Sequence, residues 1–75
     1  MIYITTLDAD RLAELMAEKS FDVSELARRS GVHRFTLSPF LRGQTNPSRR
    51  TIRAIADALG VETSEITHVT MKDAV

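Results

Sequence analysis

The chain has 75 residues and no net charge at pH 7, because ten Lys and Arg balance ten Asp and Glu. A chain of this length folds as one small domain without room for both a hydrophobic core and a deep catalytic cleft, so we expect no enzyme, metal site or cofactor. Cysteine is absent, which excludes disulfides and thiolate metal ligands. No apolar run is long enough to span a membrane, and the first ten residues lack a signal-peptide pattern, so we expect a cytoplasmic location.

Apolar side chains at helical spacing predict the first two of five short helices. The first covers residues 8–20. The second begins after Asp22, where Glu25 has the spacing of a reciprocal capping box, and ends at Gly31, which readily takes the left-handed conformation of a C-cap. The side chains that these two helices are expected to bury are Leu12, Leu15, Met16, Leu26 and Ala27.

The third predicted helix, residues 34–42, has two unlike faces. One face is basic, polar and partly aromatic, although no core requires such residues there. The helix is therefore expected to use one face for packing and to offer the other to a ligand. The apolar face carries Leu37, Phe40 and Leu41, and the opposite face carries Arg34, Phe35, Ser38 and Arg42.

Pro39 lies inside this third helix. It lacks the N–H that would bond to the carbonyl of Phe35, and it biases Ser38 away from helical angles. Because Pro39 is close to the first turn, where few N–H groups have partners, we expect a bend. The alternative is a helix that restarts with Ser38 as its cap. Either geometry tilts the polar face of the helix.

A polar loop that contains Gly43 and Pro47 leads to the fourth helix, which begins after Ser48 and ends at Gly60. The fifth predicted helix is a short turn over residues 61–66. The side chains that these two helices are expected to bury are Ile52, Ile55, Ala56, Leu59, Val61 and Ile66.

The two chain ends, residues 1–6 and 67–75, are β-branched and roughly alternating. This pattern predicts two strands that pair within one chain or between two chains, and frayed tails are the alternative. The whole chain, residues 1–75, is thus expected to form a single domain with its core in residues 8–66 and these two terminal extensions.

Basic residues gather in the middle of the chain, and no acid lies between Glu25 and Asp57. The planar guanidinium of arginine suits phosphate groups and guanine edges, so this uneven distribution predicts a nucleic-acid-binding surface. A mere sorting of charges by helix face is the alternative. Seven of the ten basic residues fall in this interval, namely Arg28, Arg29, Arg34, Arg42, Arg49, Arg50 and Arg53.

The second and third helices, residues 22–30 and 34–42 with Gly31 in the turn, have the arrangement of a helix-turn-helix, whose second helix enters the DNA major groove. The stretches SELARRSGV, LRGQTNPS and TIRAIADALGV follow one another in this order. Over residues 8–66 the sequence therefore resembles the lambda-repressor-like (XRE/Cro-type) helix-turn-helix family. The resemblance implies an all-α, compact five-helix bundle that binds operator DNA as a homodimer.

The resemblance also implies roles for single residues, carried over by position. An arginine that makes a bidentate contact with guanine contributes about 1–3 kcal/mol of base discrimination. Phe35 is expected to pack on a thymine methyl, with a core or dimer contact as the alternative. The implied base-reading residues are Arg34, Phe35 and Ser38. The implied contacts to the DNA backbone are His33, Thr36, Arg42, Gln44, Thr45, Asn46 and Arg50.

Together these observations predict a sequence-specific regulator of transcription that binds double-stranded DNA. We expect a nucleoid-associated repressor that binds an inverted-repeat operator as a homodimer through the helix over 34–42. An alternative from another class is a protein-binding module, such as an antitoxin that neutralises a toxin. In that case the acidic outer segments of the chain would face a basic protein partner.

Overall fold

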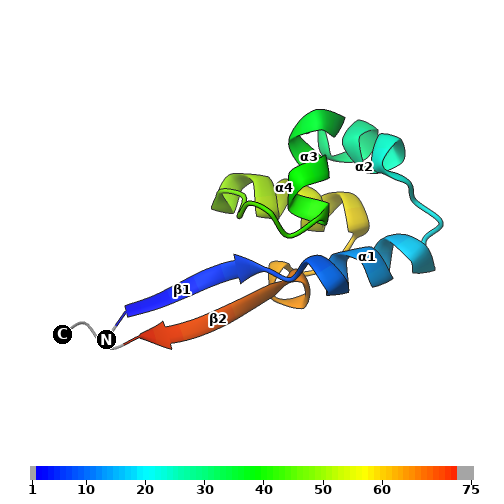
Figure 1. Ribbon diagram of the computed structural model, residues 1–75. Helices are drawn as coiled ribbons and strands as arrows, with labels where there is room; N and C mark the ends of the chain where they lie inside the picture. The colour runs from blue at the N-terminus through cyan, green and yellow to red at the C-terminus, as the bar shows by residue number, and fades with distance from the viewer. Residues whose placement is uncertain (1, 73–75) are drawn as a thin grey trace.

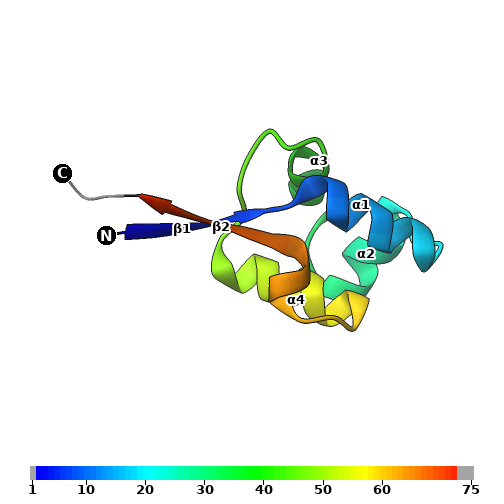
Figure 2. The same cartoon turned by 90° about the horizontal axis from the view of Figure 1, so that it is seen from below.

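The computed structural model describes the backbone of residues 2–72 and the side chains of residues 3–69. Four helices form a compact body, and two strands project from it as an arm (Figures 1 and 2). No helix in this part of the chain is long and apolar enough to cross a membrane. The elements in chain order are β1 (Ile2–Leu7), α1 (Ala9–Glu18), α2 (Val23–Ser30), α3 (Arg34–Leu41), α4 (Arg49–Leu59), the 3-10 turn η1 (Thr63–Ile66) and β2 (Thr67–Lys72).

The expected five-helix count is wrong, because the fifth predicted helix is the single 3-10 turn η1. Two hydrogen bonds hold this turn. The N–H of Glu65 donates to the carbonyl of Glu62 at 3.0 Å, and the N–H of Glu62 donates to the Glu65 carboxylate at 3.2 Å. The turn cannot lengthen, because Ile66 must reach the core and Thr67 already has the extended backbone of β2. One tight turn therefore replaces a helix here.

The chain ends form a two-stranded antiparallel sheet, which confirms the strands predicted there and adds a small β element to the helical body. The pairing lies within one chain, with Leu7 opposite Thr67 at the body and Ile2 opposite Lys72 at the far end of the arm. Of the two predicted terminal extensions, residues 1 and 73–75 lie outside the described residues.

The hydrophobic core joins all four helices, η1 and the base of the arm. Full burial of one large aliphatic side chain contributes about 1.5–3 kcal/mol, so this cluster supplies the main stabilising term of the domain. The half-buried Ala27, Phe40, Leu41 and Val61 pack against it, as their spacing predicted, and so does Val32. The core consists of Leu7, Leu12, Leu15, Met16, Leu26, Leu37, Ile52, Ile55, Ala56, Leu59 and Ile66.

Local capping sets the directions of α2 and α3. The carboxylate of Asp22 accepts a hydrogen bond from the N–H of Glu25 at 2.8 Å, which fixes the start of α2. Gly31 ends α2 with φ of 76°, in the left-handed region that disfavours other residues, and its N–H donates to the carbonyl of Ala27 at 2.9 Å. The chain therefore turns sharply into α3.

The loop between α3 and α4 is held to the arm by Asn46. Its Oδ1 accepts from the N–H of Leu7 at 2.9 Å, and its Nδ2 donates to the carbonyl of Thr5 at 3.2 Å. The next residue, Pro47, is buried. One side-chain amide thus replaces a strand neighbour at the outer edge of β1 and anchors the loop that follows α3.

Replacement of Asn46 by alanine removes both of these hydrogen bonds. We expect Asn46→Ala to lower the free energy of unfolding by about 1–2 kcal/mol, since a typical intramolecular hydrogen bond contributes about 1 kcal/mol net. Urea denaturation followed by circular dichroism measures the change. Gln44→Ala in the same loop is the matched control, because Gln44 is exposed and forms no side-chain bond within the described part of the chain. Equal stabilities of the two variants would contradict this role of Asn46.

Candidate nucleic-acid interface

The helix α3 is oriented by one fully buried residue, Leu37, whose side chain has no solvent exposure. Arg34 and Phe35 lie on the outward side, and Phe35 is 73% exposed. This exposure excludes a role for Phe35 in the core of the monomer. The guanidinium carbon of Arg34 lies 5.5 Å from the centre of the Phe35 ring. The centres of the His33 and Phe35 rings are 5.0 Å apart. These three side chains therefore form one exposed cluster at the start of α3.

His33 is the N-cap of α3. Its Nδ1 accepts a hydrogen bond from the N–H of Phe35 at 3.1 Å. Because Nδ1 is the acceptor, the neutral ring carries its proton on Nε2. The exposed His33 side chain thus combines a structural contact on one ring nitrogen with an N–H donor on the other, which suits a phosphate oxygen.

Pro39 does not break α3. The helix runs from Arg34 to Leu41 with His33 as its cap, so the alternative of a restart at Ser38 is not adopted. The hydroxyl of Ser38 donates to the carbonyl of Arg34 at 3.0 Å, a bond that tends to bend helices. Because the hydroxyl proton is used in this bond, the Ser38 oxygen can only accept a hydrogen bond from a base.

The other residues predicted to contact the DNA backbone lie on the flank of α3 and in the loop that follows it. Thr36 is exposed, and so are Arg42, which caps the C-terminal end of α3, Gln44 and Thr45. Asn46 differs from them, because both polar atoms of its side chain already bind β1. The loop thus presents a row of exposed polar groups whose last member mainly fixes its position.

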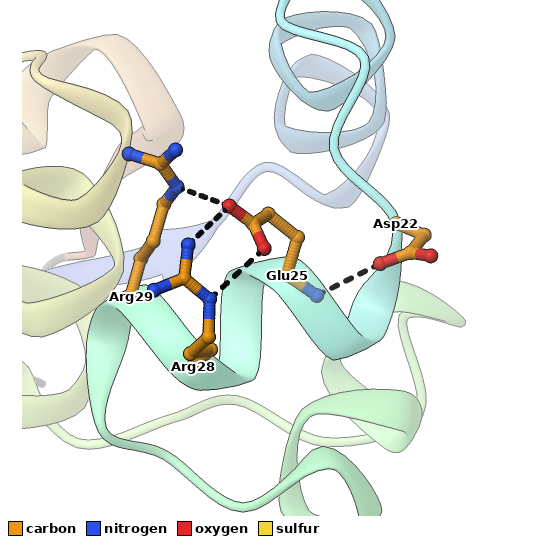
Figure 3. A network of polar contacts seen from close by, with 4 residues as sticks. All are labelled: Asp22, Glu25, Arg28 and Arg29. Atoms are coloured by element: carbon orange, nitrogen blue, oxygen red, sulfur yellow. Dashed lines mark hydrogen bonds and ion pairs between the residues drawn. The ribbon is translucent and has the colours of Figure 1, made fainter.

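Two of the seven arginines in the acid-free interval are held by an acid at its boundary. The Glu25 carboxylate binds Arg28 at 2.7 Å and Arg29 at 2.6 Å (Figure 3). The hydrogen bonds from Arg28 and then Arg29 lower the pKa of Glu25 to about 2, and the same contact raises the pKa of Arg28. Glu25 consequently does not return a bond to Asp22, so only half of the expected capping box forms.

The remaining arginines of the interval form no ion pair within the described residues. They lie on α3, on the following loop and on α4, and all are exposed. The cationic surface is therefore smaller than the sequence suggested, and three of its five members lie in the first turns of α4. Its members are Arg34, Arg42, Arg49, Arg50 and Arg53.

A hollow of about 240 Å³ at the start of α4 was not foreseen from the sequence. It depends on the packing of the arm against α4, which brings together residues far apart in the chain. Guanidinium and hydroxyl groups predominate among its lining residues, and these groups bind phosphate well. No cluster of His, Asp and Glu suited to a metal ion occurs in the part of the chain that the structure describes. The hollow is lined by Thr5, Arg49, Ile52, Arg53, Thr63 and Thr67.

Comparison with known proteins defines the class. Residues 9–69 match the family model described as a helix-turn-helix domain, so the chain belongs to the helix-turn-helix family. Among solved structures it is similar to the restriction-modification controller protein C.AhdI from Aeromonas hydrophila, with 37% sequence identity and a TM-score of 0.72. The match covers 76% of this chain and 86% of that chain. No match was found among curated proteins. The lambda-repressor-like resemblance is thereby confirmed, and a DNA-binding transcriptional regulator is supported.

The ion pairs of Glu25 predict a pH dependence of stability. Because the pKa of Glu25 in the folded protein lies below its ordinary value of 4.5, the contribution of the network is fully present above pH 4.5 and is lost as the pH falls toward about 2. We expect Glu25→Gln to melt at a lower temperature than the wild type at neutral pH, with a difference that shrinks through this acidic window.

Thermal unfolding followed by circular dichroism, over the pH range in which both proteins fold, measures this difference. Glu18→Gln is the matched control, since Glu18 is exposed and forms no ion pair within the described residues. A melting difference for Glu25→Gln that stays constant between pH 4.5 and the acid limit would contradict the assignment.

Proposed function

We propose that the protein is a sequence-specific transcriptional repressor that binds an inverted-repeat operator as a homodimer. In this proposal α3 enters the major groove of double-stranded DNA. Membership of the helix-turn-helix family supports DNA binding, and the likeness to a restriction-modification controller protein supports a regulatory role. The absence of net charge on the chain favours a contact that depends on local side chains over a general attraction to DNA.

The observation that carries the proposal is the exposed start of α3, where Phe35 is 73% exposed and the neighbouring Arg34 forms no ion pair within the described residues. In a B-DNA major groove the side chains at the start of a recognition helix meet base edges. Arg34 has two donors suited to O6 and N7 of guanine, and Phe35 offers an apolar ring to a thymine methyl. Ser38 would contribute its hydroxyl oxygen as an acceptor.

The proposed phosphate contacts surround this base-reading face. The Nε2–H of His33 and the hydroxyl of Thr36 belong to α3 itself, and Arg50 extends the surface onto α4. Phosphate contacts of this kind position a protein on DNA without reading sequence. The remaining proposed members lie after α3 and are Arg42, Gln44, Thr45 and Asn46, where Asn46 acts mainly by fixing the loop.

A homodimer is proposed on energetic grounds. One subunit offers a single short recognition helix and a handful of phosphate contacts, which gives weak binding at physiological salt. Two subunits that place their helices about one DNA turn apart, roughly 34–36 Å, would read both halves of an inverted repeat. The symmetry of such a dimer matches the symmetry of such an operator.

A second candidate function is a protein-binding module such as a toxin-neutralising antitoxin. It is favoured by the exposed apolar side chains of the arm, Tyr3, Ile4 and Val69, which a protein partner would cover. This function needs no contact between α3 and DNA. The two candidate functions therefore differ in how binding responds to salt and to the loss of an arginine outside the arm.

Salt titration of DNA binding tests the proposal. We expect the logarithm of the association constant to fall linearly with the logarithm of salt concentration, with a slope of about −0.9 per phosphate contacted. Arg50→Ala should weaken binding to all duplexes alike and make the slope less steep by about one phosphate contact. Fluorescence anisotropy with labelled duplexes provides the measurement.

Arg11→Ala is the matched control for the loss of one positive charge, because Arg11 pairs with Glu14 on α1. It should leave the slope unchanged. Salt-insensitive binding, or the absence of binding to any duplex from a random pool, would exclude the proposed regulator and leave the protein-binding module.

A further inference from the structure

The arm has two outer edges, and the direction of its backbone groups distinguishes them. Along an antiparallel strand, successive residues point their N–H and carbonyl groups to opposite sides. The N–H of Asp8 donates across the arm to the carbonyl of Ile66 at 2.8 Å. Counting back from Asp8, the backbone groups of Leu7, Thr5 and Tyr3 therefore face away from β2, at the outer edge of β1.

The outer edge of β1 is closed near the body by Asn46. This side chain binds the N–H of Leu7 and the carbonyl of Thr5, the groups that an additional strand would use. Figure 1 shows the loop between α3 and α4 on this side of the arm. A further strand therefore cannot pair with the inner half of β1 without displacing this loop.

The outer edge of β2 is open. Thr67 lies opposite Leu7 and Val69 lies opposite Thr5, so the backbone groups of Thr67 and Val69 also face outward. Their N–H groups have no hydrogen-bond partner within the described residues. No other element runs along this edge of β2 in Figure 1. The backbone groups of Thr67 and Val69 thus offer hydrogen-bond donors and acceptors to a new strand.

The arm also lacks the features that usually protect an exposed edge, such as charged side chains and proline. The strands contain no proline, and their basic residues are Lys72 at the far end and His68, whose Nε2 lies 3.1 Å from the Asp8 carboxylate of the same chain. Three of the four exposed large apolar side chains in the described part of the chain lie on the arm. A two-stranded ribbon of this kind is marginally stable alone. These exposed side chains are Tyr3, Ile4 and Val69.

We propose that the outer edge of β2 pairs with the same edge of a second copy of this chain. The product is a four-stranded antiparallel sheet in the order β1, β2, β2 of the partner and β1 of the partner, related by a two-fold axis. An edge that pairs antiparallel with itself is self-complementary, as a two-fold interface requires. The β2 strand carries no acidic residue, and the Nε2 of His68 lies 3.1 Å from the Asp8 carboxylate of its own chain, so this histidine already has a partner of opposite charge when two copies meet.

This inference rests on the proposed homodimeric function for its biological role. It assigns the dimer contact to the arm and leaves the exposed face of α3 free for DNA. In this dimer Asn46 has a second role: it occupies the outer edge of β1, so that only the outer edge of β2 is free to pair near the body.

Amide hydrogen exchange of the wild-type protein, followed by NMR at increasing protein concentration, tests the assignment. The N–H groups of Thr67 and Val69 should become more protected as the protein dimerises. Tyr3 provides an internal control, because its N–H faces the outer edge of β1 and should gain no protection. Protection of Tyr3 in place of Val69, dimerisation without protection of Val69, or a monomer at all concentrations would overturn the proposal.

Sedimentation equilibrium of Val69→Pro provides a second test. The lost N–H faces outward, so no hydrogen bond between β1 and β2 is removed, but a symmetric dimer loses two bonds. The dissociation constant of the dimer should rise about tenfold or more, since each bond contributes about 1 kcal/mol. Val69→Thr keeps the N–H and the β-branched shape and should dimerise within a few-fold of wild type. Unchanged dimerisation of Val69→Pro would refute the edge pairing.

The two proposals fail separately in these experiments. A dimer with a protected Val69 that binds no duplex would sustain the arm contact and exclude the DNA-binding function. A monomer that binds DNA with the expected salt dependence would exclude the arm contact and sustain the DNA-binding function.

Discussion

The orientation of α3 depends on the burial of Leu37. This side chain has no exposure and belongs to the same core as Leu26 of α2 and Ile55 of α4. A rotation of α3 that exposed Leu37 would cost about 2–3 kcal/mol, a large fraction of the stability of a domain this small. Because one face of the eight-residue helix is fixed in this way, Arg34 and Phe35 must face solvent. The interface proposed for DNA is therefore a direct result of how the core is packed.

Ion pairing then decides which arginines contribute to that interface. Glu25 binds both Arg28 and Arg29, so half of the positive charge of these two side chains is compensated within about one turn of their own helix. The arginines of α3, the following loop and α4 have no such partner within the described residues. A chain without net charge thus carries local positive charge on α3, on the following loop and at the start of α4. Such local charge favours contacts of defined geometry, because no overall positive field attracts the protein to DNA at long range.

Local sequence signals predicted most of the fold, and contacts between distant residues account for what they missed. The caps at Asp22 and Gly31 and the buried positions of the helices follow from spacing along the chain. The Glu25 network has a local signal of the same kind, because Arg28 and Arg29 lie three and four residues after Glu25, and it competes with the capping-box pattern for the same carboxylate. The bonds of Asn46 join residues about 40 positions apart, and the hollow beside α4 needs the arm in place, so neither has a local signal. For the same reason the sequence left open whether the terminal strands pair within one chain.

The central claim is that the exposed start of α3 reads bases, and the base preference of an Arg34→Ala variant tests it most directly. Selection of bound duplexes from a random pool, followed by affinity measurements on single-base variants of the selected site, gives this preference for wild type and variant. Loss of the Arg34 guanidinium should relax the preference at one base pair in each half of the site by about 1–3 kcal/mol, while the other positions keep theirs. An unchanged preference at every position would show that α3 is not the reading element.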